Sequence, residues 1–394
     1  MKRIAFFMGM MFLLTGCGIE TDGTAQKNQT EILFLNSCGS MSDADRVVRQ
    51  IYSEFEAQNP DIKLQMISMP SSQKVEEKVK EMVTAGRMPN LIYMNGKEFN
   101  SLYPLLVERN DLVDLLPYIN EDTELNDSIA DELFSSFLTE DGKIYTLTDV
   151  VRYYGYWYNV NMFENAGIEQ MPQTWEELVE DCEKISQWAK SIKYDIAPLH
   201  LDSETLKCLI EAYMADGRSE SWDSENGITL LKKLSEFVPL EEDSFTWQDN
   251  IRSINMGHCA IYVGDVSQEA LMNRDIKIEY SALPSQSGKL TNLSSFTPGY
   301  LVCNTGTEKQ KEACIRFLKY MLSESVQQRL LVDAGYIPSN PNVKVEELIQ
   351  KNTRLYRTWQ TVQDSPTIGR LPESALDYYQ LQDILSDIRQ QLQK

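Results

Sequence analysis

Arg152 is the residue whose chemistry can be read most directly from the sequence. A guanidinium can hold a carboxylate through two parallel hydrogen bonds, which would suit an acidic ligand. It directly precedes an aromatic run, YYGYWY at 153–158. The alternative, which we favour, is an arginine that pairs with Asp149 or another carboxylate, because the chain carries 59 acidic residues. The sequence leaves both interpretations open.

Groups suited to catalysis or metal binding are harder to find. Glycoside hydrolysis needs two carboxylates about 5 to 10 Å apart, and no pair stands out among the acidic residues. The histidines, His200 and His258, are far apart and lack a metal-ligand spacing such as His-Glu-x-x-His. We therefore expect a protein that is not an enzyme, with no catalytic residue, metal site or cofactor. A secreted glycan-acting enzyme remains an alternative.

The elements that would position a site begin with three short apolar runs at 31–36, 63–67 and 91–94. Amphipathic helical patterns separate these runs. Alternation of strand and helix predicts a parallel sheet with right-handed crossovers. Ligands bind beyond the carboxyl ends of strands in such sheets. The loops at 36–40 and 95–98 are therefore predicted to face a ligand.

Residues 151–178 are predicted to cross from one lobe of a two-lobed protein to the other. The aromatic run has the β propensity of a strand, and Gly155 inside it indicates a bend or a close approach of another backbone or a ligand. Thr174 and Glu177 have the spacing of a capping box. The apolar residues that follow recur at helical spacing, which predicts a helix with one face against a core.

Composition narrows the classes of partner. The chain has 394 residues, 42% of them hydrophobic, which allows more than one core, and its formal charge is -22. This acidity disfavours nucleic acid, whose phosphates need clustered Lys and Arg. Seven cysteines occur, of which one lies in the N-terminal segment. The others are scattered and form no Cys-x-x-Cys pair, so we expect them to be buried free thiols.

The N-terminal residues are typical of an export signal. Lys2 and Arg3 precede the apolar run 4–14, which is too short to span a membrane and reads as a secretory signal. Leu14-Thr15-Gly16-Cys17 resembles the lipobox of bacterial lipoproteins, in which Cys17 becomes the first mature residue and carries lipid. The expected parts are a signal peptide at 1–16 and a polar, flexible tether at 17–30. The resemblance implies an extracytoplasmic protein that is lipid-anchored to the outer face of the cell membrane.

Three blocks taken together resemble the family 1 extracellular solute-binding proteins, the carbohydrate-binding proteins of ATP-binding-cassette (ABC) importers. The first block runs from Tyr158-Asn159 to Glu177-Leu178, the second is INMGHCAIYVG at 254–264, and the third extends from Thr297 to Pro338. Two departures are Tyr145-Thr146-Leu147-Thr148, where the family often has Gly-Leu-Pro, and Asp265-Val266-Ser267, where many members have a tryptophan.

The resemblance implies an α/β fold of the periplasmic-binding-protein type (type II), with a ligand cleft between two lobes. Lobe 1 is expected to comprise 30–150 and 260–302, and lobe 2 is expected to comprise 151–259 and 303–394. Such a protein would capture a carbohydrate, expected to be an oligosaccharide, and deliver it to the transmembrane subunits of an ABC permease. It would act as a monomer tied to the membrane through Cys17. A sensor that presents its ligand to a membrane receptor is a further alternative.

Sugars present hydroxyls that need hydrogen-bonding partners and apolar faces that can lie on aromatic rings. Most aromatic side chains are nevertheless core residues, and Trp175 and Trp188 are expected to pack inside the second lobe. The residues expected to contact a ligand come from the strand ends, the crossing stretch and the aromatic positions of the later blocks: Asn36, Ser37, Asn95, Glu98, Arg152, Tyr154, Trp222, Asp265, Phe296, Tyr300 and Tyr336.

Overall fold

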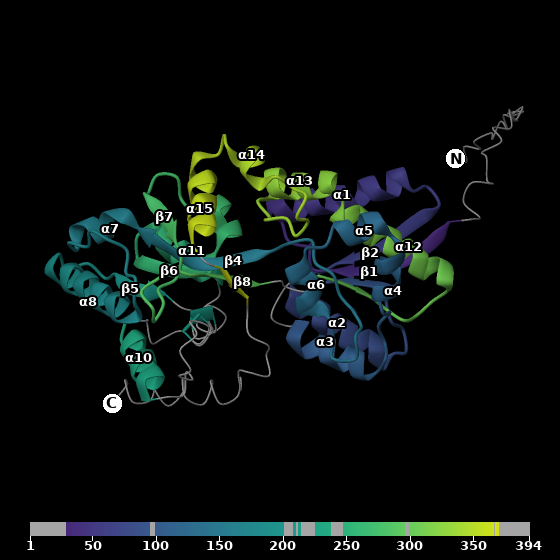
Figure 1. The fold of residues 1–394 in the computed structure, drawn as a ribbon, viewed down its shortest axis with the longest axis horizontal. Coiled ribbons are helices and arrows are strands. Elements are labelled where there is room, and N and C mark those ends of the chain that lie inside the picture. Colours follow the sequence, from purple (N-terminus) through teal and green to yellow (C-terminus); the bar gives the residue numbers. More distant parts are fainter. Residues whose placement is uncertain are drawn as a thin grey trace, which may run out of the picture.

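Two sheets, each covered by helices, divide the protein into two lobes (Figure 1). The structure is a computed structural model, and it describes residues 29–94, 99–200, 208–209, 212–213, 225–237, 247–295, 299–365 and 367–369. Within these ranges one sheet has four strands and the other has six. The mixed α/β architecture expected from the sequence is therefore confirmed.

The first lobe is built on the sheet β2-β1-β3-β9, in which β1 pairs parallel with both β2 and β3 while β9 is antiparallel to β3. The predicted parallel strands at the start of the chain are thus confirmed. Its elements are β1 (Thr30–Asn36), α1 (Asp43–Gln58), β2 (Ile62–Ser68), α2 (Ser72–Thr84), β3 (Leu91–Tyr93), α3 (Phe99–Glu108), α4 (Leu116–Glu121), α5 (Thr123–Asp127), α6 (Asp131–Phe137), β9 (Tyr300–Val302), α12 (Glu308–Leu322) and α13 (Glu324–Ala334).

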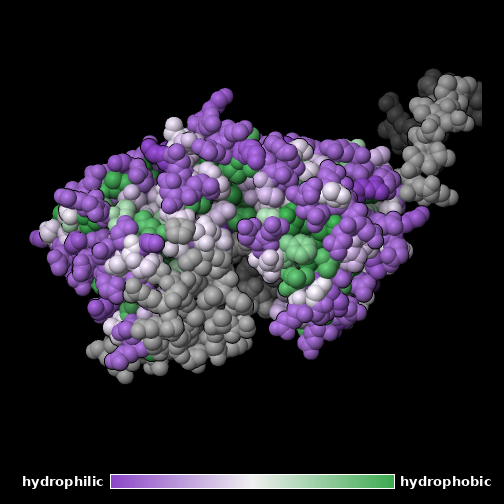
Figure 2. All heavy atoms as spheres, in the orientation of Figure 1, coloured by the Kyte–Doolittle hydropathy of each residue, from purple (hydrophilic) through white to green (hydrophobic). Residues whose placement is uncertain are grey.

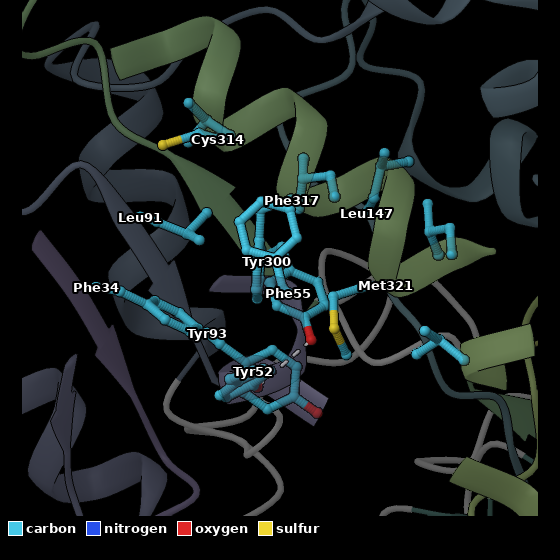
Figure 3. Packing of buried hydrophobic residues seen from close by; sticks show 14 of the residues in the cluster. Phe34, Tyr52, Phe55, Leu91, Tyr93, Leu147, Tyr300, Cys314, Phe317 and Met321 are labelled. Atoms are coloured by element: carbon cyan, nitrogen blue, oxygen red, sulfur yellow. Dashed lines mark hydrogen bonds between the residues drawn. The ribbon is translucent and has the colours of Figure 1, made fainter. Parts of the chain in front are cut away.

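Alternation along β1 divides the core of this lobe between the two faces of the sheet. Phe34 points to the cluster that contains Tyr52 and Phe317, from α1 and α12, whereas Leu35 joins the cluster on α2 and α3. The ring of Phe34 lies 5.1 Å from that of Tyr52 and 5.3 Å from that of Phe317 (Figure 3). Because side chains alternate along a strand, Asn36 shares the face of Phe34 and emerges beside this aromatic cluster.

The second lobe is built on the sheet β10-β8-β4-β6-β5, to which β7 adds by pairing with β4. Its elements are β4 (Arg152–Asn159), α7 (Val160–Asn165), α8 (Trp175–Ser191), β5 (Ala197–His200), α10 (Glu225–Ser235), α11 (Trp247–Met256), β6 (Cys259–Asp265), the 3-10 helix η2 (Val266–Leu271), β7 (Ile278–Ser281), β8 (Asn292–Ser295), α14 (Val345–Ile349), α15 (Thr353–Asp364) and β10 (Thr367–Gly369).

The central strand of this sheet is β4, the predicted crossing stretch. A side chain at Gly155 would place its Cβ 2.3 Å from the carbonyl oxygen of Ser281, so the expected close approach of another backbone is confirmed. Thr174 caps α8 by accepting from the backbone N–H of Glu177 at 3.2 Å. Trp175 is buried at 1% exposure, and Trp188 packs partly buried against the same cluster, as expected for core residues.

The expected division of the second half of the chain between the lobes is wrong in part, although α15 and β10 lie with the second sheet as expected. Residues 260–302 are expected in lobe 1, yet β6, β7 and β8 pair with β4 or belong to its sheet, and only β9 joins the first sheet. Residues 303–394 are expected in lobe 2, yet α12 and α13 pack against β1 and α1. The antiparallel pairing with β4 holds β6, β7 and β8 in the second lobe. The apolar face of α12 holds this helix in the first lobe.

Three segments connect the lobes. The first, 147–151, leads into β4; the second lies between β8 and β9; and the third runs from α13 through 335–342 to α14 and α15. The first segment bridges to Tyr300 through Leu147 and to Pro338 through Val150, so all three segments meet. We call residues 147–151, 299–300 and 335–342 the crossing segments.

The surface of the protein agrees with its composition. Figure 2 shows mostly hydrophilic side chains on the coloured part of the visible face, with apolar side chains gathered over α6 in the first lobe. The cysteines expected as thiols are buried and free of disulfides in the part of the chain that the structure describes: Cys38, Cys182, Cys208, Cys259, Cys303 and Cys314. No helix in the described ranges is long and apolar enough to cross a membrane.

Candidate functional site

Several of the residues predicted to contact a ligand gather where the crossing segments meet. Those that the structure describes are Asn36, Ser37, Arg152, Tyr154, Asp265, Tyr300 and Tyr336. The predictions for Asn95, Glu98, Trp222 and Phe296, and for lipid attachment at Cys17, lie outside the described residues.

The first lobe contributes the carboxyl end of β1. Asn36 is fully buried, and its side-chain oxygen accepts a hydrogen bond from the backbone N–H of Cys38 at 3.2 Å. Its side-chain nitrogen has no hydrogen-bond partner among the described residues. Ser37, half-buried, donates its backbone N–H to the carbonyl of Tyr93 at 3.1 Å. A buried amide without a partner costs about 1 to 3 kcal/mol, so a ligand or water hydroxyl that reached Asn36 would be favoured there.

The second lobe contributes a cation that faces a carboxylate. The register of β4 with β6 places Asp265 opposite Tyr154, and Arg152 Nη1 lies 3.9 Å from Asp265 Oδ2. Burial by itself would lower the pKa of Arg152, but Tyr154 and Asp265 outweigh it and raise that pKa. Of the two interpretations that the sequence left open, the structure shows the arginine beside a carboxylate of its own chain, which is Asp265 and not Asp149.

Asp265 is itself held in place by the element that follows it. One of its oxygens accepts hydrogen bonds from the backbone N–H of Ser267, at 2.8 Å, and from the hydroxyl of Ser267. Gln268 completes a capping box at the start of η2 by accepting from the backbone N–H of Asp265 at 3.2 Å. The other oxygen faces Arg152, so Asp265 fixes both the helix and the guanidinium.

Two of the predicted tyrosines occupy different environments. Tyr336, on the third crossing segment, is half-buried. Burial raises the pKa of Tyr336, and Cys38 and Asp45 of the first lobe raise it further, whereas Arg152 of the second lobe opposes them. Tyr336 therefore lies close to charged groups of both lobes. Tyr154 is 5% exposed and belongs to the core of the second lobe.

Tyr300 has a different place from the one predicted. It is fully buried, its ring lies 4.5 Å from that of Tyr93 and 5.9 Å from that of Phe317, and Figure 3 shows it in the middle of this aromatic cluster. Its hydroxyl donates to Asp149 at 2.9 Å and lies 3.5 Å from the hydroxyl of Tyr52. In this structure Tyr300 offers no ring face to a ligand, and it supports Asp149 instead.

Asp149 is the residue that the sequence reasoning missed, since it considered Asp149 only as a partner for Arg152. The side chain is 2% exposed, and it accepts hydrogen bonds from Tyr300 at 2.9 Å and from Tyr93 at 3.5 Å. Burial raises the pKa of Asp149 to about 6, and these two hydroxyls limit the rise. The only signal in the sequence was its position next to the crossing strand.

The histidines and the acidic residues supply no metal centre in the described ranges, where no group of three or more His, Cys, Asp or Glu could hold an ion. His200 is buried and its Nδ1 lies 3.2 Å from Asn250 Oδ1. Burial lowers the pKa of His200 and the hydrogen bond to Asn250 opposes this. Such an environment fits a structural histidine.

Comparisons with known proteins agree with this architecture. Residues 50–356 match the family described as bacterial extracellular solute-binding protein. A "Multiple sugar-binding protein" of Streptococcus mutans serotype c is 22% identical over 173 residues, which is 44% of this chain and 38% of that relative. The chain thus spans less than half the length of this curated relative.

Solved structures are similar over nearly the whole chain. A Streptococcus pneumoniae solute-binding protein in complex with the blood group A-trisaccharide superposes with a TM-score of 0.73 at 18% identity, covering 92% of this chain and 99% of that one. An ABC substrate-binding protein of Listeria monocytogenes in complex with cycloalternan gives a TM-score of 0.69 at 18% identity, covering 93% and 94%. These similarities establish the two-lobed fold.

Proposed function

The chain belongs to the bacterial extracellular solute-binding proteins, and from this membership we propose that it captures a carbohydrate between its lobes and delivers it to an ABC permease. The family is one of binding proteins, so binding without turnover is the function to test first. The relatives named above carry or are named for sugars, which supports a carbohydrate for this chain as well.

The observation that carries the proposal is the meeting of polar groups from both lobes at the crossing segments. The unpaired amide of Asn36 comes from the first lobe, and the Arg152–Asp265 pair comes from the second. Tyr336 adds a half-buried aromatic side chain near both. Donors, acceptors and an aromatic group in one place suit a ligand that carries hydroxyls and apolar ring faces.

The charges at this place favour a neutral carbohydrate. Arg152 already faces Asp265 at 3.9 Å, so an acidic sugar would have to compete with that carboxylate. Asp45 on α1 adds negative charge close by, as its effect on Cys38 shows. The carboxylate of an acidic sugar would be repelled in this environment, because like charges at short range in a protein interior cost several kcal/mol.

Membrane attachment and delivery are further parts of the proposal. The lipobox-like Leu14-Thr15-Gly16-Cys17 supports lipid attachment at Cys17, and the family membership supports an extracytoplasmic position. Anchoring at the outer face of the cell membrane would keep a monomeric binding protein near its permease. A sensor role and a glycan-acting enzyme remain the competing functions.

A thermal-shift screen of the protein carrying Cys17→Ser tests the proposal directly. The panel would contain neutral oligosaccharides, matched uronates, amino acids and short peptides. A ligand at 100 times its dissociation constant adds about 2.7 kcal/mol of stability, which is a clear rise in melting temperature. A rise with an oligosaccharide, reduced in Tyr336→Ala, is expected. A rise with peptides or amino acids and none with any sugar would overturn the carbohydrate assignment.

Turnover is tested on the same samples. Incubation of the protein with each glycan that raises its melting temperature, followed by chromatography of the sugar, should return the glycan unchanged. Appearance of shorter products that depend on the protein would favour the enzyme instead.

A further inference from the structure

Asp149 is a buried carboxyl group that lacks a compensating cation. In the part of the chain that the structure describes, it takes part in no salt bridge, and the nearby Arg152 faces Asp265 instead. Its side chain accepts hydrogen bonds from the hydroxyls of Tyr300 and Tyr93 and from its own backbone N–H, all of which are neutral donors. Burying an ionised carboxylate without a cation is costly, so burial favours the neutral acid, and the donated hydrogen bonds offset only part of that preference.

The preference of Asp149 for the neutral form can affect the connections between the lobes, because all three crossing segments meet at this residue. Asp149 belongs to the first segment, and Tyr300 lies where the second enters β9. On the third, Ser339 donates its backbone N–H to the carbonyl of Asp149 at 3.4 Å and its hydroxyl to the carbonyl of Thr148 at 2.7 Å. Asp149 is therefore bonded to the second segment through its side chain and to the third through its main-chain carbonyl, although the N–H of Ser339 also donates to Gln327 Oε1 at 2.9 Å.

Among the described residues at this junction, Asp149 is the group that titrates near pH 6. Its neighbours from the first lobe include Tyr93 on β3, Tyr300 on β9, Tyr52 on α1 and Cys38 after β1, and burial raises the pKa of each, so all stay neutral. The same holds for Tyr336 on the third segment.

The other charged groups that the structure describes beside Asp149 come from α1 and β4 and are held by other partners. Arg49 donates to the carbonyls of Cys38 and Ser40, and Asp45 accepts from the backbone N–H of Ser40 at 2.8 Å. Arg152 is held beside Asp265.

We propose that Asp149 is a proton-operated latch between the lobes. With a neutral carboxyl group it stabilises the arrangement of the crossing segments described above. With an ionised carboxylate it favours conformations of the hinge in which water reaches the group, because hydration removes the cost of burying the charge. The opening equilibrium of the hinge therefore rises with pH until Asp149 is ionised in the buried state, and then it levels off. This property goes beyond solute capture and does not depend on which solute is bound.

Hydrogen exchange at the crossing segments tests the latch without a ligand. The informative amides are those of Val151, which donates to Ile337 at 2.9 Å, and Tyr300, which donates to Leu147 at 2.7 Å. Their exchange rates in the full protein, divided by the intrinsic rate at each pH, report the opening equilibrium. We expect this ratio to rise on the order of tenfold between pH 5 and pH 7 and to level off above that, following proton linkage at Asp149.

Matched variants separate a proton effect from a loss of structure. Asp149→Asn should remove the pH dependence. Tyr300→Phe removes a hydrogen bond that favours the carboxylate, so it should move the levelling-off to higher pH, whereas a purely structural role would raise exchange equally at every pH. Asp181→Asn is the control, because Asp181 is also a buried carboxylate but lies on α8, paired with Lys184 at 2.8 Å.

The control variant should keep the response of the unaltered protein at the crossing segments. Exchange ratios that do not change with pH in the unaltered protein would overturn the latch. A pH response that persists in Asp149→Asn, or that disappears in Asp181→Asn, would do so as well.

Discussion

Replacing Asp149 by asparagine is expected to make the protein more stable at neutral pH, although it removes a hydrogen-bonded carboxyl group. Asparagine has nearly the same shape, and its side-chain oxygen can still accept the hydroxyl of Tyr300, which lies 2.9 Å from Asp149. It carries no charge, so it avoids the cost of burying an anion at a site that is 2% exposed. The gain should therefore grow above about pH 4, where this carboxyl group ionises in the unfolded chain, and reach its limit once Asp149 is ionised in the folded protein.

The size of the gain follows from the pKa of Asp149, which burial raises from 3.8 to about 6. A raised pKa means that the folded protein binds the proton more tightly than the unfolded chain does. The stability that this proton contributes is complete below about pH 4 and is lost as the pH rises through about 6. Roughly two pKa units at 1.36 kcal/mol each give about 3 kcal/mol as the upper limit of the gain in Asp149→Asn at pH 7.

Urea unfolding of the unaltered protein and of Asp149→Asn at several pH values between about 4 and 7.5 measures this difference. The two proteins should be similar at the acid end, and the variant should gain stability towards neutral pH. Tyr300→Phe should behave in the opposite way, losing more stability at pH 7 than at pH 4, because the lost hydroxyl stabilises the carboxylate. A difference between the unaltered protein and Asp149→Asn that stays constant with pH would refute the reasoning.

Three further predictions concern the core, the central strand and the ligand. Trp175→Ala should lower the free energy of unfolding by about 3 to 5 kcal/mol in urea, because the side chain is 1% exposed, whereas Trp247→Ala, at a position 45% exposed, should change it by less than about 1 kcal/mol. Gly155→Ala should lower the melting temperature measurably, since its Cβ would lie 2.3 Å from a carbonyl oxygen of β7; a melting temperature equal to that of the unaltered protein would contradict the register of β4. In calorimetric titrations, Arg152→Ala should weaken the binding of a neutral sugar as much as the binding of its acidic counterpart. Asp265→Asn should raise the affinity for the acidic sugar relative to the neutral one. A loss of affinity in Arg152→Ala that is confined to the acidic sugar would instead support a direct contact between Arg152 and the ligand carboxylate.

Local features of the sequence predicted local structure well, because each rests on interactions between residues close in the chain. The apolar run 31–36 became β1, and Thr174 caps α8. Gly155 shows a limit of this reading: its type indicated a close approach, but only the pairing of β4 with β7 identifies Ser281 as the neighbour. Strand register joins residues far apart in sequence, and no local pattern records it.

The lobe assignment failed for the same reason. The apolar pattern of 259–265 predicts a strand equally well in either sheet, and the antiparallel pairing of Tyr154 with Asp265 is what places it in the second. The helix α12 follows a strand of the first sheet and packs on β1, so its apolar face returns to the first lobe. A family resemblance carried over by blocks of sequence did not contain this information.

For the candidate site, the sequence indicated which residues end a strand, but it could not show how each side chain packs. Asn36 follows from the rule that strand ends face ligands, and its buried amide lacks a partner among the described residues. Tyr300 was chosen as an aromatic residue near a crossing, but its type could not show that Tyr93 and Phe317 enclose the ring. Aromatic residues serve cores and binding sites alike, so burial has to be observed.

Asp149 and Asp265 have different roles at the junction because the register of β4 with β6 places a cation beside Asp265 alone. Asp265 stands opposite Tyr154 and therefore beside Arg152, which gives it a cation and leaves its second oxygen to cap η2. Asp149 lies on the same strand connection but is separated from that cation, and it receives tyrosine hydroxyls instead. Asp265 therefore fixes the geometry of the guanidinium and of η2 together. Asp149 lacks such a cation and changes charge near pH 6. The sequence indicated Asp149 only as a partner for Arg152, yet Asp149 is the residue able to make the hinge respond to protons.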